Sequence, residues 1–112
     1  MATDVSTLIE RVEAFEARSG VCLQSLGAEL NPLYDDVVHL NVRGELHPQS
    51  GTELSTNIEL VVAAYDTSSK VVGTESRRFE SEGFFGFEIF DITIEIHVDK
   101  LSRIRILPKQ VD

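Results

Sequence analysis

Residues 90–98 have the sequence Phe-Asp-Ile-Thr-Ile-Glu-Ile-His-Val, an unbroken alternation of apolar and polar side chains. Successive side chains of a β-strand point to opposite faces, so this stretch predicts a strand with one buried face and one solvent face. Residues 103–107 repeat the alternation after a short interval. We therefore predict a hairpin with a turn near residues 99–101. Its expected register places Ile96 opposite Ile104, Ile94 opposite Ile106 and Glu95 opposite Arg105.

Upstream segments show the same period of two. Residues 66–70 are rich in turn-forming types and predict a second hairpin, while Asn31 and Pro32 are expected to end an earlier strand. The expected strands cover residues 21–30, 38–46, 58–64, 71–74, 90–98 and 103–107. Together they predict an antiparallel β-sandwich of five or six strands over about residues 21–107.

A different period marks the N-terminal region. One apolar stripe at the helical spacing is formed by Leu8, Val12 and Phe15. Thr7 and Glu10 match a capping box, and Gly20 suits the left-handed conformation that ends many helices. We predict an amphipathic helix over residues 7–19. A helix this short is marginal alone in water, so we expect it to cover the sandwich or, alternatively, to bind a partner or a second copy.

Length and charge bound the class of protein. The chain has 112 residues, a formal net charge of −9 and a single cysteine. The length fits one domain, residues 1–112, and the acidic surface argues against nucleic-acid binding. One cysteine excludes an internal disulfide and any multi-cysteine metal site. With neither a secretory signal nor a bilayer-spanning apolar run, we expect a cytoplasmic protein with no membrane partner and no cofactor.

One hairpin resembles a known family. Residues 61–66, Val-Val-Ala-Ala-Tyr-Asp, followed by residues 70–74, Lys-Val-Val-Gly-Thr, are similar to the hairpin of bacterial FxLYD-type domains. The Tyr-Asp pair matches the family signature, whereas Val62 and Ala64 stand in place of Phe and Leu. The resemblance covers about residues 38–98 and implies an immunoglobulin-like β-sandwich of undefined role, often in exported bacterial proteins. The predicted helix and the missing signal depart from that pattern.

The candidate interaction site is a cluster of phenylalanines. Four of the six in the chain lie at positions 84, 85, 87 and 90, and the glycines at 83 and 86 predict a turned loop. Two adjacent phenylalanines at a turn cannot easily both enter one core. We therefore predict that Phe84, Phe85 and Phe87 bind another protein or a second copy of the chain. The alternative is that they cap the sandwich or pack on the helix.

We expect a non-catalytic interaction or assembly module, because no nucleophile, acid–base pair or phosphate-binding loop is recognisable. The alternative is a small-ligand or divalent-metal-binding domain that uses the polar face of the strand at residues 90–98. Its candidate ligands are Asp91, Glu95, His97 and Asp99. Solvation of this face, with ion pairs to Arg103 and Arg105, is the competing structural interpretation.

Overall fold

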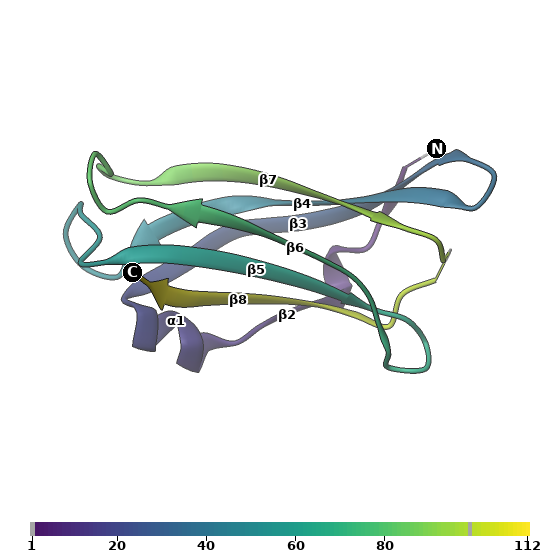
Figure 1. Cartoon of the computed structure of the whole chain (residues 1–112), viewed down its shortest axis with the longest axis horizontal. Helices are drawn as coiled ribbons and strands as arrows, with labels where there is room; N and C mark the ends of the chain where they lie inside the picture. The colour runs from purple at the N-terminus through teal and green to yellow at the C-terminus, as the bar shows by residue number, and fades with distance from the viewer. Residues whose placement is uncertain (1, 99) are drawn as a thin grey trace.

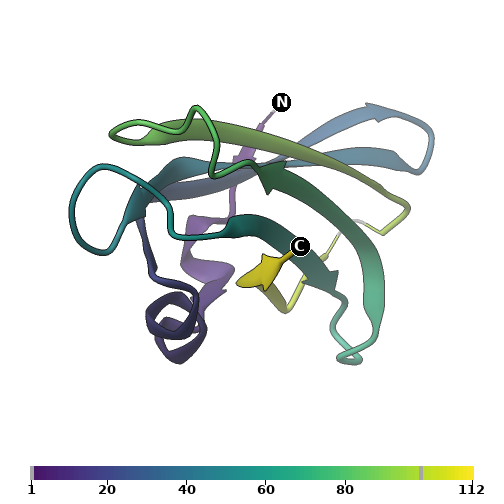
Figure 2. The same cartoon turned by 60° about the vertical axis from the view of Figure 1, so that its left-hand side comes forward.

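The computed structural model describes residues 2–98 and 100–112, which form a β-sandwich of two four-stranded sheets (Figure 1, Figure 2). The strands are β1 (Thr3–Asp4), β2 (Ile9–Arg11), β3 (Val21–Tyr34), β4 (Val37–Pro48), β5 (Asn57–Tyr65), β6 (Val71–Phe79), β7 (Glu88–Ile96) and β8 (Arg103–Val111). A 3-10 helix, η1 (Ser6–Leu8), and one α-helix, α1 (Glu13–Ser19), lie before β3. The strand orders are β1-β3-β4-β7 and β2-β8-β5-β6. The prediction of a mainly β sandwich with one helix is confirmed, with eight strands rather than five or six.

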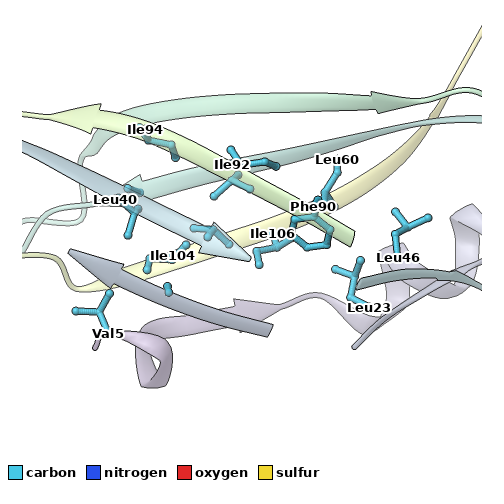
Figure 3. Packing of buried hydrophobic residues seen from close by; sticks show 14 of the residues in the cluster. Val5, Leu23, Leu40, Leu46, Leu60, Phe90, Ile92, Ile94, Ile104 and Ile106 are labelled. Carbon is cyan, nitrogen blue, oxygen red and sulfur yellow. The ribbon is translucent and has the colours of Figure 1, made fainter. Parts of the chain in front are cut away.

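The alternation seen in the sequence builds the core between the two sheets. On the inward face of β7, the side chains of Phe90, Ile92, Ile94 and Ile96 are at most 5% exposed, whereas the polar residues between them face solvent. Figure 3 shows Phe90, Ile92 and Ile94 of β7 packing in the same cluster as Ile104 and Ile106 of β8. Each fully buried side chain of this kind contributes about 1.5–3 kcal/mol to folding.

The predicted hairpin between the last two strands is wrong. β7 pairs with β4, where Ile94 lies opposite Leu40, and β8 pairs with β5, where Ile104 lies opposite Ala64. The connection between β7 and β8 passes from one sheet to the other. The isoleucines of the two strands therefore belong to opposite layers of the core. Alternation determines which face a residue occupies, but it does not determine which strand is its neighbour.

The predicted helix over residues 7–19 is correct only in its second half. Residues Ile9–Arg11 instead form β2, a parallel edge strand beside β8, because pairing there satisfies part of the free edge of β8. The expected capping box does not form: the Glu10 carboxylate accepts a hydrogen bond from Arg105 Nε at 2.8 Å. Gly20 does end α1 in the left-handed conformation, with φ of 74°.

The first expected strand is longer than predicted, because Pro32 does not end it. β3 continues to Tyr34, and Pro32 lies opposite Val38 within the β3–β4 ladder. β1 pairs with β3 only at Glu29 and Leu30. Beyond that point β3 is an edge strand, where the missing amide of a proline deprives no neighbouring strand of a hydrogen bond.

Residues 3–19 form a strap that crosses from one sheet to the other and closes one side of the sandwich (Figure 2). The backbone amide of Val5, a buried residue, donates to Ala28 O at 2.9 Å. The Ser6 hydroxyl accepts from Ala28 N at 2.9 Å and donates to Ala28 O at 3.3 Å. Ser6 also lowers the pKa of Asp4, chiefly through its side chain and then through its backbone amide.

Arg11 and Glu16 fasten the strap to the edge of β3. The Glu16 side chain is buried, and its carboxylate receives two hydrogen bonds from the Arg11 guanidinium, at 2.6 and 3.0 Å. Glu16 Oε1 also accepts from Leu23 N at 3.0 Å, while Arg11 Nη2 donates to Leu23 O at 2.8 Å. The two side chains thus satisfy the backbone groups that a neighbouring strand would satisfy. The hydrogen bond to Glu16 raises the pKa of Arg11, which stays charged.

The opposite side of the sandwich closes where the edge strands β6 and β7 approach each other. A Cβ atom on Gly73 would lie 2.6 Å from Cγ2 of Ile94 and 3.0 Å from Cγ2 of Ile96, so only glycine fits without a shift. Farther along, Arg77 Nη1 donates to the carbonyl of Ile89 at 2.9 Å. Both sides are thereby covered, and the loops at the ends of the sandwich offer the more accessible surface.

The strap predicts a large stability effect at Glu16. We expect Glu16→Ala to lower the free energy of unfolding by about 2–3 kcal/mol, because it leaves the Leu23 amide and Arg11 without their acceptor. Glu13→Ala is the control, since Glu13 is exposed on the same helix; we expect a change below about 0.5 kcal/mol. Urea unfolding followed by circular dichroism measures both. Equal stability of the two variants would contradict the role given to Glu16.

Close packing predicts a second effect at Gly44. A Cβ atom there would lie 2.6 Å from Leu26 Cδ2 and 2.8 Å from Phe90 Cζ, so we expect Gly44→Ala to destabilise the fold by about 1–3 kcal/mol. At Gly27 the nearest atom to a new Cβ is Ser6 Oγ at 3.6 Å, an ordinary contact. Gly27→Ala therefore serves as the control in the same denaturation assay. A Gly44→Ala variant as stable as the control would show that the core accommodates the methyl group.

Candidate functional site

The phenylalanine cluster lies on the loop between β6 and β7, at the end of the sandwich that also carries the loop between β4 and β5 (Figure 1). The two loops are joined by a hydrogen bond from Gly86 N to Thr52 O at 2.8 Å. The β6–β7 loop is also fixed to β5, because Ser81 N donates to the side-chain oxygen of Asn57 at 2.8 Å. These bonds hold the loop in one conformation against the body of the sandwich.

The two adjacent phenylalanines of this loop point in opposite directions. Phe84 is 4% exposed and belongs to the core, whereas Phe85 is 77% exposed. Gly83 and Gly86, with φ of 83° and 80°, supply the left-handed turns on either side of the pair. The expectation that Phe84 contacts a partner is therefore corrected: its side chain is already used in packing. Its burial anchors the loop from which Phe85 projects.

Phe87 and Ile89 continue the exposed surface along the outer face of β7. The Phe87 ring stacks on the imidazole of His47, with centroids 4.8 Å apart and planes 7° apart. His47 Nε2 lies 2.8 Å from Oε1 of Glu45, so the ring beneath Phe87 is itself held in place. Ile89, opposite Glu45 in the ladder, is 68% exposed. We call Phe85, Phe87 and Ile89 the aromatic surface.

Sequence reasoning missed Ile89, although the signal was present. The outward side of the strand runs through every second residue, and counting back from Asp91 reaches positions 89, 87 and 85 in turn. Three large apolar side chains therefore occupy positions where the rest of the strand carries polar ones. Within the described residues, the remaining exposed large apolar side chains belong to other elements. They are Phe15, Leu33, Tyr34 and Val71.

The polar face proposed as a metal site is internally paired. Asp91 Oδ2 lies 3.3 Å from Arg43 Nε, and Glu95 Oε2 lies 3.4 Å from His97 Nε2. In the part of the chain that the structure describes, no three histidine, cysteine or acidic side chains gather as a metal site would require. Asp99 lies outside the described residues. The three described candidates, Asp91, Glu95 and His97, therefore do not form a metal cluster among themselves.

The expected ion pairs of this face with the last strand are also wrong. Arg105 Nε lies 2.8 Å from Glu10 Oε1, and Arg103 Nη1 lies 3.9 Å from Glu10 Oε2. Both arginines belong to the other sheet, so they cannot reach the outer face of β7. Hydrogen bonding to Glu10 raises the pKa of Arg105. Arg103 and Arg105 of β8 therefore hold the strap through Glu10 of β2.

A polar hollow of about 340 Å³ lies between the strap and the β3–β4 ladder. Its charged groups have partners within the protein: Arg43 lies 3.5 Å from Glu29 and 3.3 Å from Asp91. The Asp4 carboxylate accepts from Ser6 N at 2.8 Å. Because these charged groups already have partners, the hollow is a weaker candidate for a binding site than the aromatic surface is.

Comparison with known protein families, with curated proteins and with solved structures finds no match to this chain. Among the residues described, no helix has the length and apolar character needed to cross a membrane.

The opposite orientations of the two phenylalanines predict opposite effects of truncation. We expect Phe84→Ala to destabilise the protein by about 3–5 kcal/mol, because it removes a buried ring from the core. Phe85→Ala, one residue away, is expected to change stability by less than about 0.5 kcal/mol. Urea denaturation of both variants checks this. A large loss at Phe85, or none at Phe84, would contradict the orientation of the loop.

Proposed function

We propose that this chain is a non-catalytic protein-interaction module that binds through the aromatic surface formed by Phe85, Phe87 and Ile89. The observation that carries the proposal is the 77% exposure of Phe85 on a loop that is anchored by buried Phe84. When a partner removes a large, exposed apolar side chain from water, the free energy of binding becomes more favourable.

Preorganisation strengthens the case for binding. A flexible loop loses conformational freedom when it binds, and that loss weakens affinity. Here the loop is fixed by the Gly86–Thr52 hydrogen bond, and the Phe87 ring is held against His47. The aromatic surface is therefore already ordered before a partner arrives, so little entropy is lost at the contact.

The order of strands supports an immunoglobulin-like assignment within this proposal. In that fold, strands A, B and E share one sheet, and strands C′, C, F and G share the other. β3, β4 and β7 follow the first order, and β6, β5 and β8 follow the second. The edge position of strand G is taken by β2, which precedes β3 in the chain and runs parallel to β8. The antiparallel β5–β6 hairpin, which contains Tyr65 and the Asp66 turn, supports the proposed relation to FxLYD-type domains.

The proposal predicts that loss of the aromatic surface abolishes partner capture. The test compares the wild-type chain with a Phe85→Ser/Ile89→Ser variant as baits in a lysate of the source organism. The matched control is Leu33→Ser/Tyr34→Ser, which removes two exposed apolar side chains at the β3–β4 turn. We expect a protein to be retained by the wild type and by the control, and to be lost from the Phe85→Ser/Ile89→Ser bait.

Circular dichroism and urea denaturation of each bait show whether it is folded. Equal retention by all three baits would assign binding to another surface. The absence of any specific protein from the wild-type bait would contradict the interaction function.

A further inference from the structure

The excess negative charge of the protein is concentrated in two segments. Residues 44–69 and 79–99 contain no lysine or arginine. Of the 19 acidic residues in the chain, ten lie in these segments, so the remainder has nine acidic residues against all 10 basic ones. The first segment includes the loop between β4 and β5, and the second includes the loop between β6 and β7 and the whole of β7. Both segments meet at the end that carries the aromatic surface (Figure 1).

Two acidic side chains beside the aromatic surface stand without internal partners. Glu82 lies in the same loop as Phe85, and Glu53 follows Thr52, the residue that accepts the Gly86 hydrogen bond. Both glutamates are exposed, and neither forms an ion pair with another described residue. Four other acidic residues of these segments, Glu59, Glu80, Glu88 and Asp91, each pair with a lysine or arginine, as Glu88 does with Arg77 at 3.1 Å.

We propose that the partner of the aromatic surface is a basic protein segment that presents a large apolar side chain between lysines or arginines. This inference rests on the proposed function and specifies the chemistry of the partner. The apolar side chain would pack on Phe85 and Ile89, and the flanking cations would lie near Glu53 and Glu82. Complementary charge of this kind speeds association and rejects wrong partners.

The same charges disfavour other occupants of the site. A second copy of this chain would bring the same acidic loops together, with Glu53 and Glu82 facing like charges unless the contact were displaced from the aromatic surface. Nucleic acids and anionic lipid surfaces carry phosphate groups, which Glu53 and Glu82 also repel. A cationic partner has the further advantage that a guanidinium can lie over an exposed ring such as Phe85. Within this protein, Arg77 lies 4.6 Å from the centroid of the Phe79 ring in that manner.

The test selects random linear peptides displayed on phage against the immobilised wild-type chain, with a parallel selection against Phe85→Ser/Ile89→Ser. We expect the wild type to enrich peptides that combine a net positive charge with an aromatic or large aliphatic residue. We expect the variant to lose these peptides. Enriched peptides that are neutral or acidic would overturn the inference while leaving the proposed function intact. Identical pools from both baits, or no enrichment on the wild type, would instead overturn the proposed function.

A second measurement isolates the contribution of the two glutamates to the affinity for the peptide. Isothermal titration calorimetry of the best enriched peptide compares the wild type with Glu53→Gln/Glu82→Gln. The matched control is Glu13→Gln/Glu75→Gln, which changes the net charge equally at exposed positions on α1 and β6. We expect affinity at low salt to fall about three- to tenfold in the first variant and to be nearly unchanged in the control. The wild-type affinity should also fall between about 0.05 and 0.5 M salt. Equal affinities of the two variants would overturn the role of Glu53 and Glu82 in binding the peptide.

Discussion

One open side of the sandwich is closed by a pair of side chains, Arg11 and Glu16, that binds the backbone of Leu23. A sandwich has open sides where edge strands expose unpaired amides and carbonyls. On the side formed by β3 and β8, a carboxylate and a guanidinium take the place of a strand at one position of β3. Because Glu16 is buried and Arg11 is half-exposed, the ion pair is shielded from water on only one side. The attraction between the two charges is therefore stronger than it would be in a fully exposed ion pair.

This closure connects local chemistry to the display of the aromatic surface. The strap occupies one side, and Gly73 and Arg77 bring β6 and β7 together on the other. Apolar side chains inside the sandwich are therefore removed from water, and three of the seven exposed large apolar side chains among the described residues lie on the β6–β7 loop and the start of β7. An ordered apolar surface on a closed frame is the feature on which the proposed recognition function depends.

Much of the fold could be predicted from the alternation of apolar and polar residues along the sequence. Alternation identified the buried face of β7 and β8, because burial is a property of each strand taken alone. It could not identify the partner of Ile94, since pairing depends on the path of the chain between sheets. The helix prediction failed at Ile9 for a related reason: β8 offered an unpaired edge, and tertiary hydrogen bonds outweighed a local helical pattern. At the site, the sequence located the loop but not the opposite orientations of Phe84 and Phe85, which depend on two left-handed glycines.

Hydrogen exchange at the backbone amide of Leu23 shows whether Arg11 and Glu16 seal the edge of β3. This amide faces the edge of β3 and has a carboxylate, rather than a strand, as its acceptor. If the edge is sealed, we expect this amide to exchange as slowly as the core amides of β4 in the wild type. We expect Glu16→Ala to make it exchange by local opening while the β4 amides remain protected. Rapid exchange of the Leu23 amide in the wild type would show that the strap does not seal this edge.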